Sequence, residues 1–232
     1  MLRYLSTSGE GTTMRPNAEP DQIRRATMQG LTFRRAAPAD TERIAEIMFE
    51  NPPRDVVGML LDEERARQIG KELVRQPNSP QGWQRTVLAE LSGEGIGVLQ
   101  AGVDHPGVRL SPGLALAALG IYGPVDLVRV VLRLRARRRV NIEEPNEAYS
   151  IAELHVDPTY RNKGIGGALL SYAEGHARQA ECRLMSLTTH MANPARRLYD
   201  RHGFRAVETR TDPDYERYTG IEGRVMMVKE LA

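Results

Sequence analysis

The 232-residue sequence has little cysteine, little net charge and no long uninterrupted apolar run. Its single cysteine, Cys182, excludes an internal disulfide framework and a cysteine-rich metal site, and it is typical of a protein from a reducing cytoplasm. The formal net charge of +2 gives no support to bulk nucleic-acid binding, so any basic site must be local. The five histidines form no H-x-H or H-x-x-x-H pair, and we therefore expect no metal site.

The segment from 105 to 140 is first strongly apolar and then strongly basic. Pro112, Pro124 and Asp126 interrupt its apolar part, which stays short of the roughly 20 uninterrupted residues that a bilayer needs. The sequence therefore predicts no membrane span, and neither a membrane nor a nucleic acid as partner.

Two helices are expected in this segment, divided at 120 to 124. In the second, Val125, Val128, Leu132 and Arg135 recur at helical spacing, which predicts that their side of the helix is buried. The other arginines, Arg129, Arg133 and Arg137 to Arg139, should reach solvent.

Residues 1–30 are poor in apolar periodicity and rich in Ser, Thr, Gly, Pro and charge, which predicts a flexible tail. Polar residues follow Leu5 directly, so we expect no secretory signal. The remaining 31–232 should form one domain, because two domains would each be small, with a helical insertion at 107–140.

Hydrophobic periodicity predicts a chain that mixes strands and helices, of class α+β. A strand, two helices, a hairpin and the insertion come first, and strand, helix, strand, helix, strand and strand follow. The expected strands are 31–36, 85–91, 96–103, 148–156, 183–189, 204–210 and 223–231, and the expected helices outside the insertion are 37–50, 62–75, 164–181 and 193–203. We expect Asp40 to cap the first of these helices.

The stretch "DPTYRNKGIGGALL" from Asp157 to Leu170 joins a strand to a helix through a small and basic loop. The start of a helix offers unpaired main-chain N–H groups and the positive end of the helix dipole. Gly164 and Gly166 allow close approach to the backbone, and basic residues add charge, so the loop is suited to an anion such as a phosphate. A plain tight turn is the alternative.

The spacing matches neither G-x-x-x-x-G-K-[ST] nor G-x-G-x-x-G; it is R-x-x-G-x-G, from Arg161 to Gly166. With "ELHVDPTYRNKGIGGALL" around it and "NPARRLYDRHGF" from Asn193 to Phe204, the chain resembles the GNAT superfamily of acetyl-CoA-dependent N-acetyltransferases. The resemblance extends from about residue 31 to the C-terminus and is most specific between Glu153 and Phe204.

This resemblance implies a GNAT fold: a central, mostly antiparallel sheet of six to seven strands, splayed at the middle, flanked by helices, with a helical insertion before the central strand. It also implies acetyl-CoA as co-substrate, with its pyrophosphate in the glycine loop and its pantetheine arm along the preceding strand. The residues implied in coenzyme binding are Leu154, His155, Val156, Arg161, Asn162, Lys163, Gly164, Ile165, Gly166, Gly167, Ala168 and Asn193.

Acetyl transfer to an amine needs a neutral amine, a stabilised oxyanion and a proton for the departing thiolate. Tyr199 matches the tyrosine that protonates the thiolate in many members, and it could instead simply pack at the helix surface. Asn193 could equally be a helix cap. Glu153 is the candidate base, although related enzymes place the base one residue earlier, at Ala152 here; His155 or a chain of waters are the alternatives.

The sequence thus predicts an enzyme, an N-acetyltransferase that moves an acetyl group to a primary amine of a small molecule or peptide by direct attack in a ternary complex. One alternative is a module that binds acyl-CoA without catalysis. A second is a membrane-surface or nucleic-acid adaptor that uses the Arg129 to Arg139 face, although this short helix has no interleaved aromatic residues. The 107–140 insertion would shape the acceptor pocket, or else complete the core or a homodimer interface. We expect the protein to be cytoplasmic.

Overall fold

The structure is a computed structural model, and it describes residues 29–76, 79, 81–103 and 111–231. Nearly all of the expected N-terminal tail, and the first residues of the expected insertion, lie outside the described residues. The elements are β1 (Leu31–Arg35), η1 (Pro38–Asp40), α2 (Thr41–Phe49), α3 (Arg54–Met59), α4 (Glu63–Arg75), η2 (Trp83–Arg85), β2 (Thr86–Leu91), β3 (Glu94–Gly102), α5 (Pro112–Arg139), β4 (Ala148–Val156), η3 (Pro158–Tyr160), α6 (Ile165–Gln179), β5 (Leu184–His190), α7 (Arg196–Arg201), β6 (Arg205–Thr211), α8 (Pro213–Thr219) and β7 (Gly223–Glu230).

One seven-stranded sheet organises the molecule, in the order β1-β2-β3-β4-β5-β7-β6. Every neighbouring pair is antiparallel except β4 and β5, which are parallel. That parallel pairing covers only Ala148 to Ser150 on β4, after which the two strands part. The prediction of a mostly antiparallel sheet splayed at its middle is therefore confirmed.

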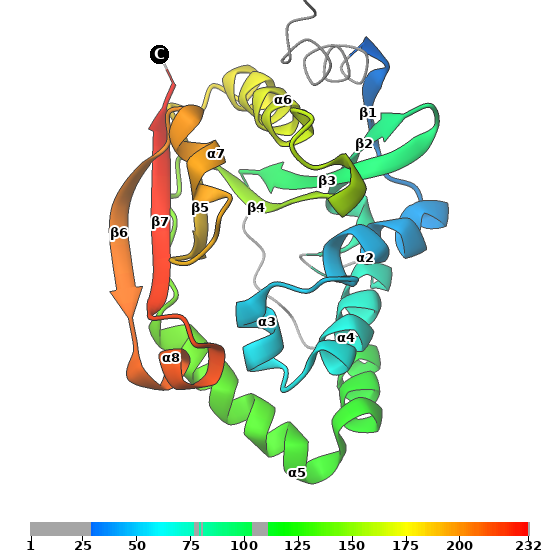
Figure 1. Cartoon of the computed structure of the whole chain (residues 1–232), viewed down its shortest axis with the longest axis vertical. Helices are drawn as coiled ribbons and strands as arrows, with labels where there is room; N and C mark the ends of the chain where they lie inside the picture. Colours follow the sequence, from blue (N-terminus) through cyan, green and yellow to red (C-terminus); the bar gives the residue numbers. More distant parts are fainter. Residues whose placement is uncertain (1–28, 77–78, 80, 104–110, 232) are drawn as a thin grey trace, which may run out of the picture.

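Alternating side chains on β2 divide the core into two layers. Val87 and Ala89 pack in the same cluster as Leu169 of α6, whereas Leu88 between them packs with Ile44 of α2. Since successive side chains of a strand point to opposite faces, α6 covers one face of this half of the sheet and α2 covers the other (Figure 1).

Helix α5 is bent into a V, with one arm beside α4 and the other beside α8 (Figure 1). The bend lies at Gly123, whose φ of 65° and ψ of 175° are not helical, and Pro124 follows it. Proline cannot continue the hydrogen-bond ladder of a helix, so the predicted division at 120 to 124 is confirmed.

The predicted buried stripe of this helix is wrong. Val125 and Val128 are 66% and 60% exposed, while Val130 and Ala136 are 5% and 0% exposed. The reason is tertiary: Val130 packs with Ile69 of α4, and Ala136 packs in a cluster with α3 and α8. The arginines are not all solvated either, since Arg133 Nη1 donates to the Gly58 main-chain oxygen at 2.6 Å.

Three further differences from the sequence prediction are local. Asp40 precedes α2 without capping it, because its carboxylate accepts from Ala37 N–H at 2.7 Å and pairs with Arg34. The helices α3 and α8 were not predicted. Asp212 accepts from the N–H of Tyr215 at the start of α8, an N-cap signal that the sequence does contain.

Candidate active site

The glycine loop ends in a left-handed residue that starts α6. Gly164 has φ 93° and serves as the N-cap of the helix, as expected. The first helical hydrogen bond runs from Ala168 N–H to Gly164 oxygen at 3.0 Å. Within the described residues, the main-chain N–H groups of 162 to 167 have no acceptor. The loop therefore presents a row of free donors at the positive end of a helix, which is an anion-binding arrangement.

An acidic residue before the loop connects it to helix α2. Asp157 accepts from the N–H of Thr159 at 2.9 Å and from Arg43 of α2 at 2.6 Å. Burial opposes ionisation of the Asp157 carboxyl, but the bonds from Thr159 and Arg43 outweigh it and lower its pKa. Asp157 stays ionised at neutral pH and fixes the loop against the opposite layer.

The two glycines after Gly164 have a packing role that the sequence did not reveal. A Cβ on Gly166 would lie 3.0 Å from Leu198 Cδ2, and one on Gly167 would lie 3.1 Å from His202 Nε2. Both contacts come from the α7 region, so the absence of side chains at these glycines lets α7 lie close against α6. Tyr199 on α7 is thereby held beside the glycine loop.

Two cationic side chains flank the loop. Arg161 Nε donates to the main-chain oxygen of Val156 at 3.1 Å, and Lys163 Nζ lies 4.8 Å from the centre of the Tyr160 ring. Both contacts are on the surface and leave further donors of each group for an anion.

The second half of β4 has an open edge. From residue 151 onward β4 has no pairing with β5. Asp157 N–H donates to Ile96 oxygen on the β3 side, so the main-chain groups of the preceding Val156 point away from β3. The same alternation applies to Leu154. The side chains of Leu154 and Val156 would both lie 3.9 Å from a Cβ on Gly166, which places them toward α6.

Glu153 and His155 share the other face of β4. His155 Nε2 lies 2.8 Å from Glu153 Oε2, and both side chains are half-buried. The pairing of β3 with β4 shifts register between Gln100 and Ala101, so Ala152 is the extra residue of a bulge, and it is exposed. Glu153 and His155 follow this bulge and are two residues apart on the strand, so their side chains point to the same face and form the carboxylate–imidazole pair.

Tyr199 lies at the edge of the main core. Its side chain is 6% exposed, and its ring centre is 6.1 Å from that of Phe204. Burial raises the pKa of Tyr199 to about 12, and the negative charge of Glu153 contributes in the same direction. Tyr199 and Glu153 are therefore electrostatic neighbours, although they come from different elements.

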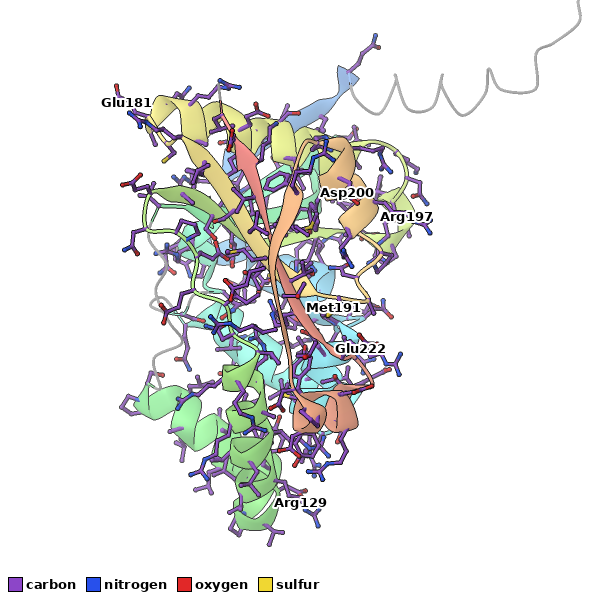
Figure 2. The ribbon with its side chains drawn as sticks, turned by 90° about the vertical axis from the view of Figure 1, so that its left-hand side faces the viewer. Arg129, Glu181, Met191, Arg197, Asp200 and Glu222 are labelled. Atoms are coloured by element: carbon purple, nitrogen blue, oxygen red, sulfur yellow. The ribbon has the colours of Figure 1, made fainter. Side chains whose placement is uncertain are left out.

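The Asn193 side chain forms hydrogen bonds within its own turn. Its Nδ2 donates to Thr189 Oγ1 at 2.6 Å, and its Oδ1 accepts from Ala195 N–H at 2.9 Å. A hollow of about 490 Å³ adjoins this turn, lined by Met191, Ala192, Asn193, Pro194, Arg196, Arg197 and Asp200. Figure 2 shows Met191, Arg197 and Asp200 along one side of the molecule.

A buried charge cluster lies where β5 has parted from β4, and the sequence analysis did not find it. Asp55 of α3 is 6% exposed, pairs with Arg224 Nη1 of β7 at 3.0 Å and accepts from the Tyr215 hydroxyl at 3.3 Å. His190 lies opposite Arg224 across the β5–β7 pair. Because these residues come from distant segments without a common spacing, no local pattern marks them.

Arg137 of α5 adds a second positive charge to this cluster. Burial lowers the pKa of Arg137 to about 10, the charge of Arg224 lowers it further, and the negative charges of Asp55 and Glu153 act against this. Within the described part of the chain, Arg137 makes no ion pair. Thr188 Oγ1, His190 Nδ1 and Arg224 Nε are buried there and have no hydrogen-bond partner among the described residues.

The described residues contain no group of three or more His, Cys, Asp or Glu side chains that could hold a metal ion. Glu153 and His155 form only a pair.

Comparisons with known proteins agree with this geometry. The model of the Acetyltransferase (GNAT) family matches residues 77–204. Mycothiol acetyltransferase of Stackebrandtia nassauensis is 38% identical over 65 residues, which is 28% of this chain and only 21% of that protein.

Solved structures match the fold over most of the chain. The PaiA N-acetyltransferase from Thermoplasma acidophilum in complex with coenzyme A is 15% identical, with TM-score 0.51, covering 87% of this chain and 99% of that one. The mosquito arylalkylamine N-acetyltransferase like 5b is 18% identical, with TM-score 0.50, covering 87% and 100%.

Proposed function

This chain belongs to the acetyltransferase (GNAT) family, and on that premise we propose that it is an N-acetyltransferase that moves an acetyl group from acetyl-CoA to a primary amine in a ternary complex. One observation carries the proposal. The free N–H groups of 162 to 167 lie directly after the open edge of β4, so a diphosphate and the extended arm attached to it have adjacent main-chain partners.

The residues present fit coenzyme A. The left-handed Gly164 turns the loop's donors toward one point, and the Arg161 and Lys163 side chains supply positive charge beside them. The main-chain groups of Leu154 and the N–H of Val156, which point away from β3, suit the amides of a pantetheine arm. Bound acetyl-CoA supplies a thioester whose carbonyl carbon is the electrophile.

The chain's own groups account for the proton movements. The amine nitrogen forms a bond to the carbonyl carbon while the carbon–sulfur bond breaks, giving an amide and a thiol. Glu153, paired with His155, accepts the proton that the amine loses. Tyr199, which stays protonated at neutral pH, donates a proton to the departing sulfur. A main-chain N–H on the open edge near Val156 stabilises the oxyanion.

The charge cluster indicates a class of acceptor. Arg224 is paired with Asp55, whereas Arg137 makes no ion pair within the described residues and is influenced by the charges of both Asp55 and Glu153. A guanidinium without an ion pair near Glu153 favours an acceptor that carries an anionic group, such as a carboxylate or phosphate, beside its amine.

The test combines binding and turnover. Calorimetry should detect acetyl-CoA binding, and release of free thiol should be followed with a panel of amines in matched pairs that differ only by a carboxylate or phosphate. We expect thiol release with the anionic members. Binding of acetyl-CoA without thiol release from any amine would favour the non-catalytic module instead, and absence of binding by folded protein would overturn both.

The insertion also bears on the acceptor. Arg137 places the C-terminal arm of α5 beside Glu153, which supports the expectation that the insertion shapes the acceptor pocket. The same helix completes core clusters with α3, α4 and α8, so the two roles coexist.

A further inference from the structure

The outer face of α5 is unusually apolar for a surface. Nine large hydrophobic side chains are exposed in the described part of the chain, and seven of them belong to this helix. They are Leu116, Leu119, Val125, Val128, Val131, Leu132 and Leu134. In its most apolar window of 18 residues, only 17% of the residues are buried. Such contiguous exposure marks an interaction site.

The bend at Gly123 turns this face into a protruding tip. The two arms of α5 meet at one end of the molecule (Figure 1). Arg129, on the second arm, lies at the end opposite Glu181, which follows α6 (Figure 2). Leu119 and Val125, on either side of the bend, are 50% and 66% exposed. The apolar side chains are therefore at an extremity and free to meet a flat surface.

Positive charge follows the apolar side chains along the same face. Val128, Val131 and Leu132 are succeeded at helical spacing by Arg135 and Arg138, both exposed. Within the described residues neither arginine has an ion pair, in contrast to Arg139 on the same turn, which pairs with Asp212 and Asp214. The face is thus apolar at the tip and cationic farther up the second arm.

This order of charge and apolarity complements the surface of an anionic membrane. Hydrocarbon lies beneath a layer of phosphates, so a tip of Leu and Val side chains can enter the boundary while arginines farther up meet the phosphates. Nucleic acid would leave the apolar side chains in water. A second copy packed face to face would bring the same unpaired arginines together without acidic partners.

We propose that the kinked helix α5 is a peripheral membrane anchor, which inserts its apolar tip at the headgroup boundary of anionic lipid membranes and binds their phosphates through Arg135 and Arg138. The helix lies on the membrane and does not span it. Its other side buries Tyr122, Val130 and Ala136 against the protein, and its ladder is broken at Gly123. The sequence expectation of no membrane partner rested on the interruption of the apolar run by Pro112, Pro124 and Asp126, which argues against a span and not against a helix lying on the surface.

Vesicle co-sedimentation of the full chain tests the proposal. The vesicles are phosphatidylcholine alone, or with roughly a quarter phosphatidylserine. We expect at least about tenfold tighter binding to the anionic vesicles, weakened by high salt. The double variant Val125→Asp/Val128→Asp should lose at least about tenfold of this binding, because two charges would enter the apolar boundary.

Matched controls separate the anchor from general surface effects. Val207→Asp changes a valine that is 57% exposed on β6 and should bind vesicles like the parent chain. The pair Arg135→Glu/Arg138→Glu should abolish the preference for anionic vesicles, whereas Arg205→Glu on β6 should not. Thermal unfolding and acetyl-CoA binding of each variant should match the parent, which shows that the fold is retained.

Three results would overturn the proposal. The first is parent binding no stronger to anionic than to neutral vesicles, and the second is full binding by Val125→Asp/Val128→Asp. The third is a dimer in analytical ultracentrifugation that those two substitutions dissociate, because the same face would then be an interface between copies of the chain.

Discussion

Tyr199 is the residue whose chemistry depends most on its surroundings. Its ring is almost fully buried near Phe204, and its pKa of about 12 keeps the phenol protonated far above neutral pH. Because the phenol is neutral at pH 7, Tyr199 is in the form that can donate a proton to the departing sulfur and not in the form that could deprotonate an amine. The proposed base is therefore another group, and the candidate is Glu153, whose charge acts on Tyr199 and whose carboxylate pairs with His155.

Replacing this hydroxyl should affect chemistry and not binding. We expect Tyr199→Phe to lower kcat by about 100-fold, the usual contribution of a positioned acid, with the acetyl-CoA Kd unchanged. Steady-state kinetics and calorimetry measure the two. Tyr172→Phe, on α6 and half-buried, is the control and should keep kcat near that of the parent. A normal kcat in Tyr199→Phe would contradict the acid role.

The buried pair of Asp55 and Arg224 should dominate stability among the ion pairs. Asp55→Ala leaves the Arg224 guanidinium buried beside Arg137, and we expect a loss of about 3–5 kcal/mol in the free energy of unfolding. Glu63→Ala removes an ion pair whose carboxylate is 66% exposed and should cost about 0.5 kcal/mol or less. Denaturant unfolding measures both, and equal effects would show that the buried pair has no special weight.

At the scale of elements, α6 combines a ligand-binding end with a packed body. Three glycines at its start have two different roles. Gly164 needs its left-handed φ, while Gly166 and Gly167 need the space in which α7 packs. The helix thus connects coenzyme binding to the position of Tyr199 through a few contacts.

Alanine at two glycines of this helix should have different effects, on acetyl-CoA binding at one and on the free energy of unfolding at the other. Gly164→Ala places a Cβ in the left-handed region and should weaken acetyl-CoA binding by about tenfold through strain of roughly 1–2 kcal/mol. Gly175→Ala, where nothing lies within 4 Å of an added Cβ, should raise the unfolding free energy by about 0.5–1 kcal/mol. Calorimetry and denaturant unfolding distinguish the two, and similar effects on binding would refute the assigned conformational role.

Neighbouring valines of α5 test its orientation. Val130 is 5% exposed and packs with Ile69 and Tyr122, so Val130→Ala should lower the unfolding free energy by about 1–2 kcal/mol. Val131 is 45% exposed, and Val131→Ala should change it by less than about 0.5 kcal/mol. The reverse order would mean that the helix buries the stripe predicted from the sequence.

The sequence predicted those features that depend on neighbouring residues, and it missed those that depend on contacts between distant ones. Periodicity is local, and it predicted the strands and α4 to within a few residues. The spacing around Gly164 predicted where α6 starts, and the loop's main-chain N–H groups there have no acceptor within the described residues. The buried side of α5 depends on which partners lie beside it, and the cluster of Asp55 with Arg224 joins residues 169 positions apart. No local pattern contains that information.

At the scale of the whole molecule, the splayed sheet leaves two halves that other elements join. Helix α5 does so with its second arm, where Asp126 near the bend is bound to Arg65 of α4 and Arg139 at the far end is bound to Asp212 before α8. Deleting the helix would expose Met59 and the other residues of the core clusters that it completes. We therefore expect loss of folding, and not selective loss of turnover, from such a deletion.

Three buried tyrosines, each in a different core cluster, should make this structure sensitive to alkali. Burial raises the pKa of Tyr122, Tyr199 and Tyr215 to about 12. Because the neutral phenols are favoured in the folded state, their stabilising effect is complete below pH 10 and is lost as the pH rises toward 12. Unfolding at a series of pH values should show this decline in one transition, and it should be shallower for Tyr199→Phe.

The unpaired edge of β4 has a practical consequence for handling the protein. A free strand edge is a template on which other chains can add as strands, and here it precedes the loop proposed to hold coenzyme A. A bound pantetheine arm would occupy that edge. Preparations stored with coenzyme A should therefore precipitate more slowly than those stored without it, and light scattering over days of storage would record the difference.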